Sequence, residues 1–147
     1  NPHSMEIRSR VGSAYILRGD FESGMKLLNE VSAIADNHAA WLEFYYFLNA
    51  YHSGDRSEAK RHAFRASVTK TPLGAIARII ALHQRGNDPA AKKWITYLES
   101  EFPEFAIDVR AALGRMQMLS AIAERLTDEL EAAGLSAKRL NTAHGIR

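Results

Sequence analysis

The chain has 147 residues, of which 46% are hydrophobic, and its 19 Lys and Arg against 17 Asp and Glu give a net charge of +2. This length predicts a single domain, and the apolar content is sufficient for a hydrophobic core. The absence of cysteine excludes disulfides, thiol catalysis and cysteine-based zinc sites, and the balanced charge gives no reason to expect a nucleic acid or a membrane as partner.

In chain order, apolar periodicity and turn residues predict eight helices and no strand. Residues 1–5 have the composition of an expression-vector scar and are set aside. The predicted helices cover residues 6–17, 21–35, 39–52, 56–69, 73–84, 88–101, 104–115 and 118–133. Short polar linkers favour antiparallel neighbours. Residues 134–147 have few apolar side chains and are predicted to form a flexible tail after Gly134.

A repeated turn divides the first two thirds of the chain into three units. Gly19, Gly54 and Gly86 lie 35 and 32 residues apart, and each is followed by Asp or Asn. Glycine can end a helix in the left-handed conformation, and Asp or Asn can cap the helix that follows. The sequence therefore predicts an all-α fold of three antiparallel helix pairs, over residues 6–38, 39–71 and 72–105, stacked as a short solenoid.

These units resemble the tetratricopeptide repeat over residues 6 to 105. The residues that carry the resemblance are Gly12, Tyr15, Gly19, Gly54, Ala59, Gly86, Ala91 and Pro103. The first unit departs from the family pattern, because Gly24 stands where the family prefers Ala and Asp36 replaces the terminal Pro. The resemblance implies a right-handed solenoid of about three repeats that binds proteins, with residues 106–133 as capping helices.

A narrower resemblance extends from Trp41 to Leu135. The aromatic and glycine positions after Trp41, the pair Phe102-Pro103 and the ending Ala133-Gly134-Leu135 are similar to the carboxy-terminal region of certain bacterial signalling proteins. In that group a tetratricopeptide array follows a class III adenylate or guanylate cyclase domain, or a winged-helix DNA-binding domain. The resemblance implies a regulatory module of a cytoplasmic signalling protein or transcriptional regulator, with the parent's chemistry outside these 147 residues.

The predicted helix over residues 39–52 is apolar on almost every side, with only Glu43, Asn49 and His52 polar after Trp41. Two interpretations stay open. A helix that is apolar all round is normally buried, whereas tetratricopeptide-like geometry would place part of it on a concave groove that binds a peptide or a partner helix. Arg10 and His83 are candidate polar contacts of that groove. The predicted groove residues are Trp41, Phe44, Tyr45, Leu48, Tyr51, Leu73, Ile76 and Ile80.

The expected partner is a protein or peptide, an upstream domain of the same parent, or a second copy of the chain that fills the groove. The main alternative function is an internal scaffold of a cyclase or DNA-binding regulator. Basic residues at 60–62, 65, 92 and 93 predict a solvated convex face, with contact to nucleic acid or an acidic domain as the alternative.

Catalytic, metal and cofactor sites are not expected. The five histidines after the scar lack the spacing of a zinc site, and no nucleophile motif or phosphate-binding glycine loop is present. These histidines are His38, His52, His62, His83 and His144. Carboxylates lie on polar helix faces beside basic residues, where no apolar environment raises their pKa for acid or base chemistry. The chain is therefore not expected to be an enzyme.

The last predicted helices carry an apolar stripe with helical spacing. Its members are Met116, Leu119, Ile122, Ala123, Leu126 and Leu130. Because a repeat array exposes an apolar face at its last unit, we expect this stripe to cap the third pair. Dimerisation through the same stripe is the alternative.

Overall fold

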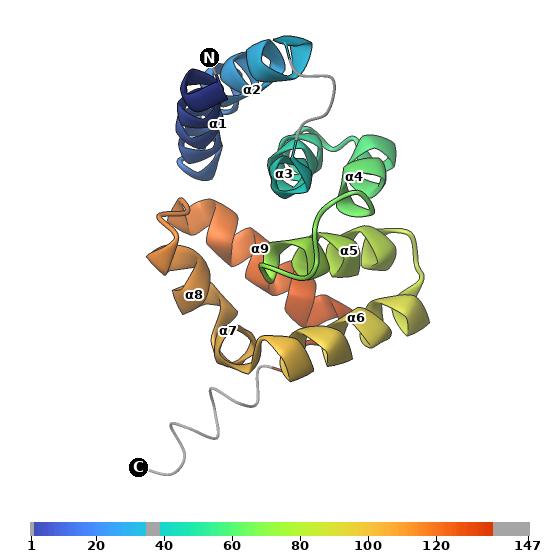
Figure 1. Cartoon of the computed structure of the whole chain (residues 1–147). Coiled ribbons are helices and arrows are strands. Elements are labelled where there is room, and N and C mark those ends of the chain that lie inside the picture. Colours follow the sequence, from blue (N-terminus) through green and yellow to red (C-terminus); the bar gives the residue numbers. More distant parts are fainter. Residues whose placement is uncertain (1, 35–38, 137–147) are drawn as a thin grey trace.

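The computed structural model describes residues 2–34 and 39–136, and within these ranges the chain is helical and forms no strand. The elements are α1 (Pro2–Leu17), α2 (Phe21–Ile34), the 3-10 turn η1 (Ala40–Leu42), α3 (Glu43–Ser53), α4 (Arg56–Ala63), α5 (Leu73–Gln84), α6 (Asp88–Glu101), α7 (Pro103–Ile107), α8 (Val109–Arg115) and α9 (Ser120–Ala133). Figure 1 shows consecutive helices arranged as neighbouring pairs. The all-α prediction is confirmed for the described residues, while the tetratricopeptide assignment and the handedness of a solenoid stay predictions.

Three turns with the same geometry join the two helices of each pair. Gly19, Gly54 and Gly86 adopt φ values of +88°, +81° and +74°. After each glycine, the next residue donates its N–H to a carbonyl five residues earlier in the first helix, at 2.9 Å in all three turns. Its side chain then accepts from the backbone N–H of the third residue of the following helix. Glycine suits the left-handed conformation, and the Asx side chain caps the second helix, so each of the three turns has the geometry that the sequence predicts.

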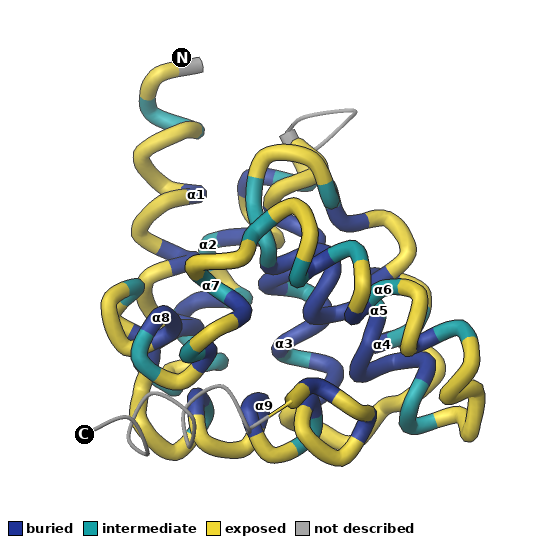
Figure 2. The backbone as a smooth tube through the Cα atoms, turned by 90° about the horizontal axis from the view of Figure 1, so that it is seen from below, coloured by how far each residue is buried: buried dark blue, intermediate teal, exposed yellow. Residues whose placement is uncertain are grey.

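Each pair buries one side of both of its helices. Gly12 of α1 allows close approach to α2, since a Cβ there would lie 3.1 Å from the Gly24 carbonyl oxygen. Ala59 and Ala91, at matching places in α4 and α6, are fully buried against their partner helices. In Figure 2 the burial lies mainly on the inward sides of α3 and α5, at the centre of the molecule. Small residues thus set the distance within each pair.

Several boundaries differ from the sequence-based expectation. Helix α1 begins at Pro2, four residues early, so most of the expected scar is helical. Helix α4 ends at Ala63, six residues before the predicted end, and Arg78 donates to the carbonyls of Ala63, Phe64 and Ala66 around that end.

The single helix expected over residues 104–115 is two short helices. Asp108 interrupts it with φ −149° and ψ 81°, and its side chain accepts from the Ala111 N–H to begin α8. The last helix begins at Ser120 instead of residue 118. Gly134 ends α9, but the expectation that the chain leaves the fold there is wrong for Leu135, which is only 6% exposed and donates its N–H to the Leu130 carbonyl.

Helix α9 contacts more of the fold than a cap on the third pair would. It packs along α5 and also contacts α6 and α8 (Figure 1). At its start, the Leu119 N–H donates to the Leu17 carbonyl at 2.7 Å, which ties it to the end of α1. Leu126 and Leu130 are fully buried. One helix therefore contacts parts of the fold that belong to the first and third units.

None of the helices in the described part of the chain is long and apolar enough to cross a membrane.

Candidate functional site

The predicted groove residues lie almost entirely in the core. Trp41 is 37% exposed, whereas the other seven are between 0% and 8% exposed. Those seven are Phe44, Tyr45, Leu48, Tyr51, Leu73, Ile76 and Ile80. As a set they therefore do not line an open groove, although Leu48 and Tyr51 border a smaller hollow of about 230 Å³ beside α9, and the alternative of buried helices describes most of them. Their burial follows from packing on both sides, because α3 and α5 lie between other helices.

Helix α9 is what covers the predicted groove beside Tyr51. The Tyr51 hydroxyl donates to Oε1 of Glu129 at 3.3 Å, and the Arg125 guanidinium lies 4.5 Å from the Tyr51 ring centroid. Burial, together with the nearby Glu129 carboxylate, raises the pKa of Tyr51 to about 12. The chain thus supplies its own helix where a peptide, an upstream domain or a second copy was expected.

The two candidate polar contacts of that groove have local partners. Arg10 pairs with Glu6 one turn away in α1, at 3.1 Å. His83 Nδ1 lies 2.8 Å from an oxygen of Asp88, across the turn between α5 and α6. The structure does not bring either side chain together with the predicted groove residues.

A different hollow, which we call the α2–α4 groove, opens between the first two pairs. It has a volume of about 370 Å³, with α3 as its floor and α2 and α4 as its walls. The lining residues are Met25, Asn29, Ser32, Tyr46, Asn49, Ala50, Ser53, Asp55, Glu58, Arg61, His62 and Arg65. Most of these side chains are polar, and none of the predicted groove residues is among them.

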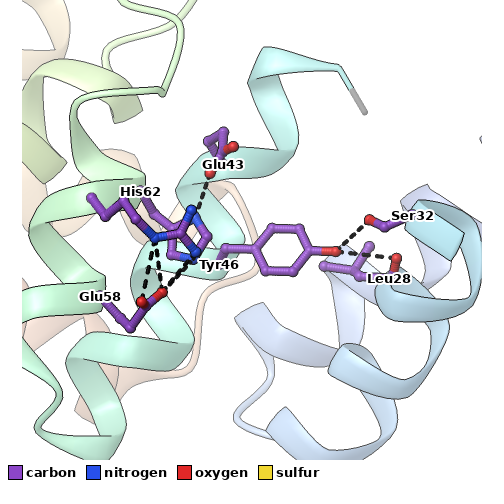
Figure 3. Close-up of polar contacts among 7 residues, drawn as sticks. Leu28, Ser32, Glu43, Tyr46, Glu58 and His62 are labelled. Carbon is purple, nitrogen blue, oxygen red and sulfur yellow. Dashed lines mark hydrogen bonds and ion pairs between the residues drawn. The ribbon is translucent and has the colours of Figure 1, made fainter. Parts of the chain in front are cut away.

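Tyr46 fixes the floor of this groove. Figure 3 shows its ring pointing from α3 toward α2, where its hydroxyl lies 2.7 Å from Ser32 Oγ and donates to the Leu28 carbonyl at 3.1 Å. Burial raises the pKa of Tyr46, although the Ser32 hydroxyl acts in the opposite direction. The ring also stacks on His62, with centroids 5.2 Å apart. Tyr46 therefore connects the two walls.

A buried contact between a histidine and a glutamate supports the α4 wall. His62 Nδ1 lies 2.5 Å from Oε2 of Glu43, and both residues are almost fully buried. On its other side, His62 Nε2 is 3.4 Å from Glu58, which also accepts from Arg61 at 2.7 Å (Figure 3). The Arg61 guanidinium holds the pKa of Glu58 below its usual range. These bonds hold α3 and α4 together and fix the His62 ring beneath the groove.

Three polar side chains of the groove are not used by the fold. Asn29 from α2, Asn49 from α3 and Arg65 beyond the end of α4 form no hydrogen bond or ion pair with other described residues. A carboxamide can donate and accept at once, which matches the N–H and C=O of an extended peptide, and a guanidinium matches a carboxylate. In their chemistry these three side chains match a peptide backbone and one acidic group.

The basic cluster on α4 is only partly a solvated face. Arg61 and Arg65 are exposed, but His62 is buried, so the expectation of a purely solvated convex surface is wrong there. Lys92 and Lys93 of α6 are exposed. His38 and His144 lie outside the described residues.

The described ranges contain no cluster of three or more metal-binding side chains. Sequence reasoning missed the α2–α4 groove because its walls come from separate units. The one signal was Asn49, a carboxamide in an otherwise apolar helix. Comparison with known proteins found no matching family model, and no curated protein or solved structure with significant similarity.

Proposed function

We propose that this chain is a non-catalytic protein-interaction module that binds an extended segment of a partner protein in the α2–α4 groove. The observation that carries the proposal is the pair of carboxamides, Asn29 and Asn49, that line the groove without partners in the fold. Arg65 supplies a positive charge at the same site. The expected ligand is therefore an extended peptide with an Asp or Glu side chain.

The groove replaces the aromatic surface as the proposed contact site. Its floor and the α4 wall are held by Tyr46 and the His62–Glu43 pair, so a ligand would meet a preformed surface. On the sequence resemblance alone, we further propose that the module belongs to the regulatory part of a cytoplasmic bacterial signalling protein.

Selection from a library of random decapeptides on the immobilised full chain tests this function. We expect enrichment of peptides that contain Asp or Glu, and loss of that enrichment in the Asn29→Ala, Asn49→Ala double variant. Two lost hydrogen bonds weaken binding by about 5-fold to about 150-fold, since each contributes roughly 0.5–1.5 kcal/mol. Arg65→Ala should weaken the acidic preference alone.

The matched control is Lys92→Ala, Lys93→Ala, which removes two exposed cations from α6 and should leave the selection unchanged. Circular dichroism establishes that each variant is folded. If the chain enriches no peptide, or if the double variant enriches the same peptides as the wild type, the binding function at this groove is wrong.

One observation favours the alternative of an internal scaffold. The predicted aromatic groove beside Tyr51 is covered by α9 of the same chain, as expected for a module that holds other domains in place without a free ligand. A failed peptide selection in a folded chain would favour this second function.

A further inference from the structure

Helix α1 carries an exposed apolar stripe on its outer face. Ile7, Val11 and Tyr15 are four residues apart and are 49%, 42% and 43% exposed. Ser9 and Ser13, on the opposite face, are almost fully buried. In Figure 2 the first part of α1 extends away from the rest of the molecule, with exposed residues along it. We call these three residues the α1 stripe.

The repeat gives each stripe residue two counterparts. Counted back from the turn glycine, the stripe lies 12, 8 and 4 residues before Gly19. The same positions before Gly54 and Gly86 are Leu42, Tyr46 and Ala50 in the second unit, and Gly74, Arg78 and Leu82 in the third. Leu42, Ala50 and Leu82 are between 2% and 8% exposed, and Gly74 is also buried. Tyr46 and Arg78 are partly buried. The stripe is thus exposed at positions that the other two units cover.

Two of the counterparts, Tyr46 and Arg78, contact the second helix of the preceding pair. Tyr46 donates its hydroxyl to the Leu28 carbonyl of α2, and Arg78 donates Nε–H to the Ala63 carbonyl of α4, at 3.3 Å. Leu28 and Ala63 are equivalent, because each lies nine residues after its turn glycine. In both cases, the residue eight positions before a turn glycine donates to the carbonyl of the residue nine positions after the preceding turn glycine.

A second contact joins the third unit to the second. Gly74 approaches the preceding unit so closely that a Cβ there would lie 2.0 Å from the Ser67 carbonyl oxygen. Ser67 lies 13 residues after Gly54, as Ser32 lies 13 residues after Gly19, and Ser32 is the residue whose hydroxyl meets Tyr46. Both interfaces therefore involve residues nine and thirteen positions after the turn glycine, although Ser67 lies beyond the end of α4 and meets a different position of the next first helix than Ser32 does.

We propose that the α1 stripe is the receiving surface for the second helix of a further helix pair, joined covalently ahead of α1 and running antiparallel to it. Residues nine and thirteen positions after the turn of that pair would lie over Val11. Val11 cannot donate to a carbonyl as Tyr46 and Arg78 do, so the contact there is apolar.

The size of the stripe favours an occupant in the same polypeptide over a second copy. A stable interface between separate proteins buries about 800 Å² on each partner, which three half-exposed side chains do not provide. Association of separate chains also costs translational and rotational freedom, whereas a linked helix pair is already held near the surface. This proposal does not depend on the peptide-binding function.

Duplication of residues 6–40 within the full chain tests the proposal. The added copy places its turn glycine 35 residues before Gly19, the spacing between Gly19 and Gly54. Because the chain has no cysteine, Ser32→Cys in the first copy and Val11→Cys in the second form a unique pair for a short bismaleimide crosslinker. We expect an intramolecular crosslink, and its loss when Ile7→Asp and Tyr15→Asp are added to the second copy.

The control places the second cysteine at Ile107 of α7 in place of Val11, because Ile107 is 49% exposed and Val11 is 42% exposed. Urea denaturation provides a second readout, in which the duplicated chain should have a higher midpoint and the two Asp substitutions should remove the increase. The same substitutions in the original chain should leave its midpoint nearly unchanged, because both sites are exposed. Crosslinking no greater than in the control, or unaffected by the Asp substitutions, would overturn the proposal. So would efficient crosslinking between two unduplicated chains that carry both cysteines, because that result assigns the stripe to a second copy.

Discussion

Replacement of Gly74 by alanine should strongly destabilise the fold, although alanine is the better helix former. An ideal Cβ at Gly74 would lie 2.0 Å from the Ser67 carbonyl oxygen and 2.7 Å from its carbonyl carbon. Carbon and oxygen atoms normally approach to about 3.3 Å, so α5 and the preceding segment must separate by more than 1 Å. That segment cannot yield easily, because Arg78 bonds the adjacent Ala66 carbonyl.

The expected loss follows from two opposed effects. Overpacking costs about 1–3 kcal/mol and more against rigid backbone, while Gly→Ala in a helix gains about 1 kcal/mol. We therefore expect Gly74→Ala to lose about 2 kcal/mol of unfolding free energy. Gly114→Ala is the matched control, because it has no atom within 4 Å of the added Cβ and should gain about 0.5–1 kcal/mol.

Urea denaturation followed by circular dichroism at 222 nm, the usual helical band, measures both variants against the wild type, and equal slopes justify the comparison of midpoints. Gly74→Ala with a stability equal to or above that of the wild type would refute the reasoning, because it would mean that α5 does not approach Ser67 closely. A loss in Gly114→Ala as large as that in Gly74→Ala would also contradict it.

Three further predictions use the same denaturation assay. Leu130→Ala should cost about 2–5 kcal/mol, because Leu130 of α9 is fully buried in the core, and a cost below 1 kcal/mol would place α9 outside the core. His62→Ala should cost about 3–5 kcal/mol, because it removes a partner from the buried Glu43 carboxylate, and Glu43→Gln in the same chain should recover part of the loss. Raising the pH from about 10 to about 12 should destabilise the wild type, because the folded chain holds the Tyr51 proton more tightly than the unfolded chain. Tyr51→Phe should reduce that decline, and an unchanged pH profile would argue against the raised pKa.

Local signals predicted much of the fold. The Gly-Asp and Gly-Asn turns could be placed because left-handed glycine and Asx capping depend only on neighbouring residues. The break at Asp108 was missed, although an Asp ahead of a helical segment is itself a capping signal. The early end of α4 depends on Arg78, 15 residues beyond Ala63, and no local pattern indicates it.

The position of α9 could not be derived, because its apolar stripe has the same spacing whether it caps the third pair or crosses several units. The placement of α9 determines whether the aromatic side of α3 is covered, because Tyr51 of α3 contacts Arg125 and Glu129 of α9. The α2–α4 groove could not be predicted from the sequence for a related reason. Asn29, Asn49 and Arg65 belong to three segments, and only the packing of two units brings them together.

The course of α9 also affects how the molecule unfolds. In an open repeat array each unit contacts only its neighbours, so the end units can unfold separately. Here the bond from Leu119 to Leu17 joins segments about 100 residues apart, and α9 packs on α5 and α6 as well. Loss of α1 and loss of α9 are therefore coupled, and the chain should melt in one cooperative transition. Contacts of such long sequence separation should also slow its folding relative to an open array.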